Sequence, residues 1–418
     1  MLKAPGTAVR NLAVSALIGL LLAGGAACAA HRAVSGLAAD RSDRSVTAHS
    51  AGAVVSGLPG SWKRQRAPHL RKFRLQSVSC SPDGRHCLAV GVFCVWATCP
   101  GTHAGAVLAT ADGGSAWVRR PLPPGIRFGG YFVGDPTRLS GALSCAGPRR
   151  CVVLGWQGRG KRRHMAILLT TTGGKTWVVI NGRRLGSGMN NISCPAVSTC
   201  FAAGSQGASV TVIKTTDGGH KWVHLRLPRG TGFLTSISCP STLRCTAVGA
   251  GGAYDAYPVA VSTATGGRAW TRGILPRHIS PLSTVSCPTS STCFAVAYSQ
   301  GPVILSTTDG GKRWRERWRE SHNSIFTELV AISCPSAATC AAAGITHPFL
   351  SDPTRLIVAT SNGGSTWTQT RPAGLSELLS VSCSRTLRCV AVGNWWGGPA
   401  SANEFTKSGA LIFINRHI

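Results

Sequence analysis

The sequence predicts an all-β fold, a seven-bladed β-propeller with a disulfide within each blade. Two short motifs that alternate along the chain support this prediction: a close pair of cysteines and a Gly-Gly-x-x-Trp hairpin. The cysteine pairs recur at intervals usually under 50 residues, the period of a propeller blade. High glycine content (51 residues) and only 14% charged residues also favour many short strands and tight turns.

Fourteen of the 17 cysteines form the close pairs, each opened by Ser-Cys. A short apolar run follows each second cysteine, so the pair brackets the turn between two strands. Cysteines facing each other across such a hairpin are well placed for a disulfide. A zinc site would need a matching Cys or His pair in each repeat, and none is present. The predicted pairs are Cys80/Cys87, Cys145/Cys151, Cys194/Cys200, Cys239/Cys245, Cys287/Cys293, Cys334/Cys340 and Cys383/Cys389.

The second motif predicts a hairpin between the third and fourth strands of each blade. Its first residue is Asp, Asn or Thr, whose oxygen can accept hydrogen bonds from the turn, and the two glycines permit positive φ. The tryptophan begins the fourth strand and can pack between blades. The six copies are 112–117, 172–177, 217–222, 265–270, 309–314 and 362–367.

Seven cysteine pairs but only six hairpins indicate that the last blade is completed from the other end of the chain. The third strand of the last repeat is Ala410–Ile414, after which the sequence stops. Trp62 and Lys63 lie upstream of the first cysteine pair at nearly the spacing of the other repeats. We therefore predict that the N-terminal strand closes the seventh blade, which removes free sheet edges.

The N-terminal region predicts export and three segments. Lys3 and Arg10 precede an apolar run, so residues 1–30 are expected to be a signal peptide or a membrane or lipid anchor. Cys28 ends a stretch resembling a bacterial lipobox, which makes it the candidate lipidation site; a cleaved signal and an uncleaved anchor remain alternatives. Residues 31–58 are expected to be a flexible linker and 59–418 the propeller, in an extracellular or cell-envelope location.

The Thr-Thr-Asp-Gly-Gly-x-x-Trp stretches at Thr215–Trp222 and Thr307–Trp314 resemble the Asp-box, or bacterial neuraminidase repeat. The resemblance covers residues 60–416 and implies a propeller of the sialidase-like and photosystem II assembly-factor-like superfamily. In such families the Asp-box is a structural turn away from the active site. A sialidase would also need an arginine triad and a Tyr–Glu pair. The expected early Arg-Ile-Pro element is missing, so the resemblance implies a non-catalytic, exported member.

The face opposite the cysteine and Gly-Gly turns carries the candidate ligand site, because its loops vary in length and composition. Tryptophans and cations there fall on the neighbouring blades seven, one and two. Exposed aromatics beside cations suit stacking on sugars or bases, although packing over the channel is the alternative. Cys94 and Cys99 bracket one of these tryptophans and are predicted to form an eighth disulfide. The candidate ligand-binding residues are Trp96, Trp156, Trp395, Trp396, Arg159, Lys161, Arg162 and Arg163.

The net charge of +30 predicts an anionic partner. We expect binding without catalysis to an anionic glycan, a cell-wall polymer or a protein, and we expect no cofactor, no metal and a monomer. Export argues against nucleic acid as the partner. The alternatives are a sialidase-like glycoside hydrolase, which would need two converging carboxyl groups, and a scaffold or assembly factor for a membrane protein complex.

Overall fold

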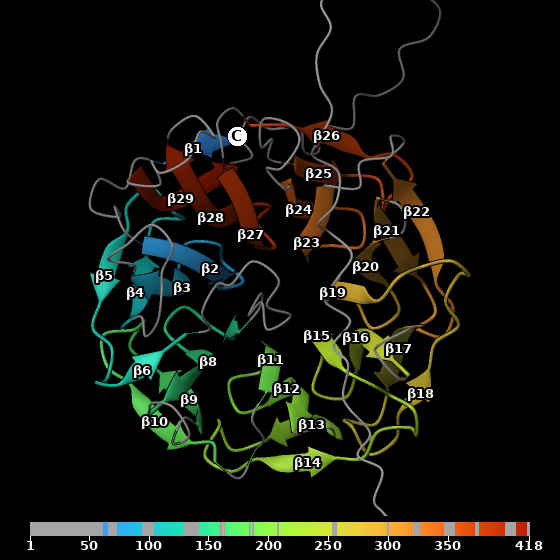
Figure 1. Ribbon diagram of the computed structural model, residues 1–418, viewed down its shortest axis with the longest axis horizontal. Helices are drawn as coiled ribbons and strands as arrows, with labels where there is room; N and C mark the ends of the chain where they lie inside the picture. Colours follow the sequence, from blue (N-terminus) through green and yellow to red (C-terminus); the bar gives the residue numbers. More distant parts are fainter. Residues whose placement is uncertain are drawn as a thin grey trace, which may run out of the picture. The chain divides into compact units, whose positions relative to one another are not determined.

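A computed structural model confirms the all-β, seven-bladed propeller (Figure 1). It describes residues 62–65, 73–93, 104–128, 142–158, 162, 164–183, 185, 188–206, 209–252, 257–298, 301–320, 327–346, 356–372, 376–397 and 407–415. Seven antiparallel sheets surround a common axis, each with one edge strand at the axis and the other at the rim. No helix that could cross a bilayer is found in these ranges.

Each blade is a sheet whose strands follow one another from the axis outwards. Blade one contains β2 (Phe73–Cys80), β3 (Cys87–Phe93), β4 (Ala104–Thr110) and β5 (Val118–Arg120); blade two contains β6 (Ile126–Arg127) with β7 (Leu143–Cys145), β8 (Cys151–Gln157), β9 (His164–Thr170) and β10 (Val178–Asn181). Blade three contains β11 (Gly188–Ser193), β12 (Cys200–Gln206), β13 (Ser209–Thr215) and β14 (Val223–Leu225); blade four contains β15 (Leu234–Ser238), β16 (Cys245–Gly251), β17 (Tyr257–Thr263) and β18 (Thr271–Arg272); blade five contains β19 (Leu282–Ser286), β20 (Cys293–Tyr298), β21 (Pro302–Thr307) and β22 (Arg315–Arg319). Blade six contains β23 (Thr327–Ser333), β24 (Cys340–Thr346), β25 (Leu356–Thr360) and β26 (Thr368–Thr370); blade seven contains β27 (Ser376–Cys383), β28 (Cys389–Gly397), β29 (Lys407–Asn415) and β1 (Lys63–Arg64).

The N-terminal strand closes the ring, as predicted. β1 is the outermost strand of blade seven and pairs antiparallel with β29, Lys63 opposite Ile414. The Gln65 amide extends this pairing by donating to the Ile412 carbonyl at 2.8 Å. Because the last blade combines both ends of the chain, the ring has no free first or last blade.

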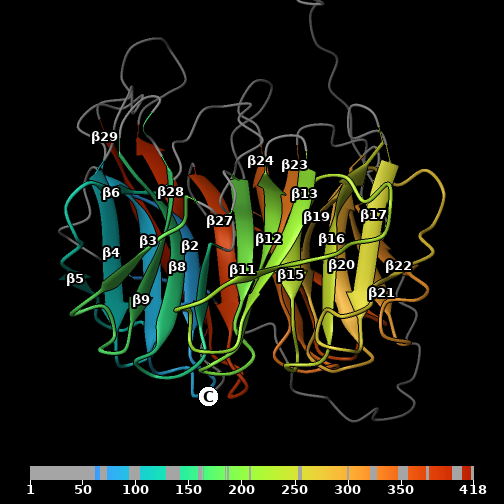
Figure 2. The same ribbon diagram turned by 90° about the horizontal axis from the view of Figure 1, so that it is seen from below.

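Strand register places both sequence motifs at the same end of each blade. In blade one, Cys80 lies opposite Cys87, and Cys87 lies opposite Thr110. The Gly113 amide then donates to the Arg85 carbonyl at 2.8 Å, which joins the Gly-Gly turn to the cysteine loop. We call the end that carries the cysteine loops and Gly-Gly turns the disulfide face, at the bottom of Figure 2, and the opposite end the loop face.

All seven predicted disulfides of the repeat are present. Their Cα–Cα distances are 4.0 to 4.1 Å. In blades one, two and seven the two cysteines are directly opposite each other in the strand register. Such a set of disulfides indicates an oxidising, extracytoplasmic environment. The predicted eighth pair, Cys94 and Cys99, and the candidate lipidation site Cys28 lie outside the described residues.

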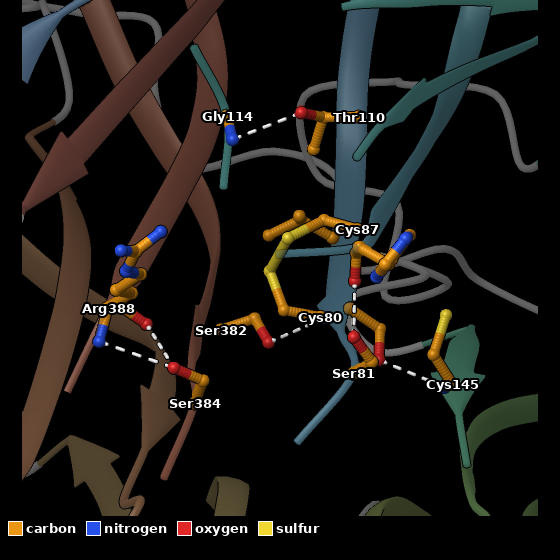
Figure 3. Close-up of a disulfide and its surroundings, with 12 residues drawn as sticks. Cys80, Ser81, Cys87, Thr110, Gly114, Cys145, Ser382, Ser384 and Arg388 are labelled. Atoms are coloured by element: carbon orange, nitrogen blue, oxygen red, sulfur yellow. Dashed lines mark hydrogen bonds between the residues drawn. A yellow bond between two sulfur atoms is a disulfide. The ribbon is translucent and has the colours of Figure 1, made fainter. Parts of the chain in front are cut away.

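The serine of each Ser-Cys motif joins its blade to the next one. Its hydroxyl accepts a hydrogen bond from the backbone N–H of the first cysteine in the following blade, and the bond from Cys80 to Ser382 connects blade one back to blade seven (Figure 3). The seven bonds, of 2.9 to 3.0 Å, therefore form a closed circle around the axis. They are Ser79–Cys145, Ser144–Cys194, Ser193–Cys239, Ser238–Cys287, Ser286–Cys334, Ser333–Cys383 and Ser382–Cys80.

The tryptophan of each Gly-Gly hairpin packs at a junction between blades, as predicted. Seven apolar clusters each combine buried residues from two neighbouring blades. Trp62 of the closing segment takes this position between blades six and seven, where the sequence has no Gly-Gly turn. The others, from junction seven/one onward, are Trp117, Trp177, Trp222, Trp270, Trp314 and Trp367.

The Gly-Gly turns have the predicted hydrogen bonds. In blade one, Asp112 Oδ1 accepts from Thr110 Oγ1 and from the amides of Ser115 and Ala116, at 2.7 to 3.0 Å. The same pattern recurs at Asp217 and Asp309. Burial alone would raise the pKa of Asp112, but these hydrogen bonds to the carboxylate outweigh it and lower the pKa.

Blade two departs from the four-strand expectation because its inner strand is split. β6 pairs with the loop-face end of β8 and β7 pairs with the disulfide-face end, so two short strands share the place of one. Both remain in the ring, since Ile126 and Leu143 are buried in the core shared with blade one. Residues 129–141, which separate the two strands, lie outside the described residues.

Replacing one serine of the circle should weaken the fold measurably. In Ser238→Ala the Cys287 amide loses its acceptor inside a junction, and we expect the free energy of unfolding to fall by about 1–2 kcal/mol. Ser241→Ala, which removes an exposed acceptor for the Arg244 amide in the same blade, should cost less than about 0.5 kcal/mol. If denaturant unfolding showed the same loss of unfolding free energy in both variants, the Ser–Cys hydrogen bonds between blades would not have this stabilising role.

Acid should destabilise the protein partly through Asp83. Burial acts to raise the pKa of Asp83, but hydrogen bonds from Ser81, Arg85 and His86 lower it from 3.8 to about 2. A pKa lowered by folding stabilises the protein above pH 3.8, and this stabilisation is lost as the pH falls through about 2. Because the group is partly exposed, we expect a contribution of about 1 kcal/mol.

Denaturant unfolding at several pH values between these limits measures this contribution. The difference in stability between wild type and Asp83→Asn should shrink as the pH falls. Glu316→Gln is the matched control, since Glu316 pairs with Arg319 on an exposed strand. An Asp83→Asn curve parallel to that of wild type would contradict the prediction.

Candidate functional site

Trp156 lies inside strand β8 and not in the loop after it. Its neighbours in register are Arg127 of β6 and Met165 of β9. The side chain is half-buried and packs against the core shared by blades two and three. Much of its surface is thus used in packing, the alternative that the sequence left open.

Trp395 and Trp396 also belong to a strand. Strand β28 extends to Gly397, and the register places Trp395 opposite Ser376 and Gly409. The sequence suggested a loop here because the apolar run seemed to end at Gly393. The long partner strand β29 continues the ladder instead.

The remaining predicted ligand residues are only partly covered by the structure. Arg162 is exposed, and its carbonyl oxygen lies 3.2 Å from Nδ1 of His164, the first residue of β9. The others fall outside the described residues, so the structure neither brings them together nor separates them. They are Trp96, Arg159, Lys161 and Arg163.

The inner strands of blades six, seven and one contribute charged residues at one equivalent position, close to the loop face. Six blades have a β-bulge in the inner strand after a buried Leu or Met. The residue before that Leu is Glu328 in blade six, Glu377 in blade seven and Arg74 in blade one. Glu377 and Arg74 are buried, and Glu328 is half-buried.

Glu377 is held by a neighbour on the adjacent strand. Asn394 Nδ2 donates to Glu377 Oε1 at 2.7 Å, and both side chains are 1% exposed. Such a partner reduces the cost of burying a carboxyl group. The pair forms a fixed polar element near the axis. Sequence analysis did not identify it, because cross-strand pairing depends on the bulge.

Each of the eight carboxylates in the described residues has a structural partner. The three turn aspartates bind the amides of their own turns, and Asp83 binds its own cysteine loop. Glu316 pairs with Arg319, and Glu320 pairs with Arg371. Glu377 binds Asn394, and Glu328 is also engaged. In the described residues, each carboxylate is therefore engaged by a neighbouring group.

Two further features bear on chemistry. The described residues contain no group of three or more His, Cys, Asp or Glu side chains that could hold a metal ion. A cavity of about 210 Å³ opens at the disulfide face between blades four and five, away from the predicted ligand site. Arg244, Lys312 and several hydroxyl side chains line it.

Comparisons with known proteins identify the fold without a sequence family. No protein-family model and no curated protein sequence matches the chain. Among solved structures, it is similar to YCF48 bound to a D1 peptide, with 15% identity, a TM-score of 0.54 and coverage of 85% of this chain and 97% of that chain. YCF48 from Cyanidioschyzon merolae gives 15% identity, a TM-score of 0.53 and coverage of 85% and 98%.

U3-55K matches with 10% identity, a TM-score of 0.54 and coverage of 85% of this chain and 98% of that chain. At these identities the likeness is one of fold, and the same fold can serve unrelated functions. The comparisons agree with the observed architecture: the chain is a complete seven-bladed propeller.

Proposed function

We propose that this chain is an extracytoplasmic binding propeller that holds an anionic partner on its loop face and performs no chemistry. The main support for the proposal is the imbalance between acidic and basic residues. The eight described carboxylates are engaged in structural contacts, while lysine and arginine outnumber acidic residues by 44 to 14. The excess positive charge attracts a partner of opposite sign.

A protein segment is the partner class with most support. One structural neighbour, YCF48, is seen bound to a D1 peptide. The alternative, an assembly or scaffold role for a membrane protein complex, would use the same kind of protein-segment binding. An anionic glycan or cell-wall polymer is the second class, favoured by tryptophans placed beside cations.

The proposed site spans blades seven, one and two. Strands β28 and β8 bring Trp395, Trp396 and Trp156 to the loop-face ends of their blades, and exposed Arg162 follows β8. The inner-strand residues Arg74 and Glu377 lie at the same end. Rigid blades that carry variable loops are a common basis for recognition.

We also propose roles for the N-terminal segments that lie outside the described residues. Residues 1–30 export the chain, Cys28 or the apolar run anchors it, and residues 31–58 link the anchor to the propeller at 59–418. The Gly-Gly turns act as Asp-boxes, a proposal supported by the shared hydrogen bonds of Asp112, Asp217 and Asp309. Their carboxylates stabilise hairpins at the face opposite the proposed site.

Binding by residues 54–418 to a library of acidic peptides and to a panel of anionic glycans tests the function. We expect saturable binding that weakens as salt rises from about 50 to 300 mM. Arg162→Glu should weaken it several-fold without affecting the fold, and Trp395→Ala/Trp396→Ala should weaken it about tenfold. Trp318→Ala, on outer strand β22, is the matched aromatic control and should bind as wild type does.

Peptide binding that depends on these residues would support the protein class, and glycan binding alone would support the second class. Binding unaffected by Arg162→Glu and by the tryptophan pair would remove the proposed site. Turnover of a glycan in the panel would overturn the non-catalytic assignment.

A further inference from the structure

We propose that the disulfide face docks on an anionic lipid bilayer, with the cavity between blades four and five receiving a headgroup phosphate. This surface is opposite the proposed partner site, so the inference goes beyond the proposed function. Three kinds of observation support it: charge, exposed apolar tips, and a cavity lined by hydroxyl groups and cations.

The disulfide face is strongly basic. Its cysteine loops and Gly-Gly turns contain eleven arginines and lysines but only four acidic residues, all aspartates bonded to their own turns or loops. None of the eleven forms an ion pair in the described structure. They are Arg85, Arg149, Arg150, Lys175, Lys221, Arg244, Arg268, Lys312, Arg313, Arg385 and Arg388.

Most of these side chains are available to a surface. Nine are exposed, and only Arg150 and Arg388 are half-buried; Arg150 donates to the Gly218 carbonyl of the next blade at 3.0 Å. Because the turns are short and repeated around one ring, they lie at a similar level along the axis (Figure 2). A broad surface of this kind matches the plane of anionic headgroups, which attracts basic residues individually.

Apolar residues stand at the tips of two cysteine loops on the same face. Val197 in blade three is 54% exposed, and Leu243 in blade four is 55% exposed. Leu243 lies against Gly266 of the Gly-Gly turn in the same blade, yet more than half of its surface remains exposed. Apolar residues beside cations are typical of surfaces that enter the headgroup region of a membrane.

The cavity lies beside Leu243 and differs in composition from the other junctions. The residue after the second cysteine is apolar in six blades, but in blade four it is Thr246. Ser262 lies on the third strand of the same blade, and Gly311 of the next blade packs against Thr246 and Ser262. At the following junction the equivalent Gly364 packs against Phe294. At the junction of blades four and five, the hydroxyl-bearing side chains of Thr246 and Ser262 thus take the place of a larger apolar side chain.

Cations stand at the same cavity. Arg244 and Lys312 line it together with Thr289 and Ser290, and both cations are exposed. Asp309 lines it as well, but its carboxylate accepts hydrogen bonds from Thr307 and from the amides of Lys312 and Arg313. Hydroxyl and cationic donors together are the groups that hold a phosphate oxygen, and a volume of about 210 Å³ is sufficient for a phosphate group.

The chain also enters the propeller at this face. Lys63 pairs with Ile414, near the disulfide-face end of β29, and the strand then runs toward the loop face. The first described strand of the propeller therefore begins at the disulfide face.

Vesicle co-sedimentation of residues 54–418 tests the proposal. This part is a compact unit with all seven blades and their disulfides, and it lacks the predicted anchor. The probes are vesicles of phosphatidylcholine alone and of phosphatidylcholine mixed with phosphatidylglycerol. We expect binding to the mixed vesicles only, decreasing at about 500 mM salt.

Charge reversal on the two faces gives a matched comparison. Four substitutions on the disulfide face, Lys221→Glu, Arg244→Glu, Arg268→Glu and Lys312→Glu, should together reduce vesicle binding roughly tenfold or more. The control carries the same charge change in exposed residues of the strand connections toward the loop face, at Arg183→Glu, Arg226→Glu, Arg229→Glu and Arg277→Glu. It should retain most of the binding, and unfolding curves verify that both variants fold.

Two further variants separate a membrane from other anions. Val197→Ser/Leu243→Ser should weaken vesicle binding several-fold but leave binding to soluble polyphosphate unchanged. Thr246→Leu fills the cavity without altering charge and should weaken vesicle binding several-fold.

Equal loss in both charge variants, or no loss in either, would overturn the docking face. Polyphosphate binding with no vesicle binding would replace the bilayer with a soluble polyanion. Inorganic phosphate that abolishes vesicle binding at low concentration would assign the cavity to a free anion. Peptide binding is measured separately, so failure here leaves the loop-face function testable.

Discussion

The ring depends on the hydrogen bond that the first cysteine amide of each blade donates to the serine hydroxyl of the blade before it. Each bond lies at the inner strands, where blades approach most closely, and the same residue pair repeats seven times without a gap. The adjacent disulfide holds the cysteine in place on its hairpin. Ser382 lies on the inner strand of blade seven and β1 is the outer strand of the same blade, so the circle of serines and the closure by β1 meet in one blade.

This construction explains how the two faces differ. Hydrogen bonding in the short turns engages the acidic residues of the disulfide face and leaves its cations exposed. The loop face is free of that repeated requirement, so its connections can vary in length. Both proposals follow from this division, with a partner on the variable face and a bilayer against the regular one. The closed ring holds the two at opposite ends of a rigid body.

Much of the fold could be predicted from the sequence because its determinants are local. Cysteine spacing, Gly-Gly turns and the tryptophan after them specify hairpins within a few residues, and counting the motifs revealed the missing strand. The contacts of Ser238 with Cys287 and of Glu377 with Asn394 could not be predicted, because they depend on strand register and on bulges. The extension of β28 through Trp395 and Trp396 has the same origin, since the partner strand β29 prolongs it.

Closure by the N-terminal strand is the central claim, and hydrogen exchange tests it most directly. Mass spectrometry would compare residues 54–418 with a chain that begins at residue 66 and lacks Trp62 and β1. Without β1, we expect the β29 amides and the amides of Cys80 and Cys383, at the two junctions of blade seven, to lose protection at least about tenfold relative to Cys239 on the far side of the ring. Unchanged protection of Cys80 and Cys383 would show that the ring holds without its N-terminal strand and would contradict the account.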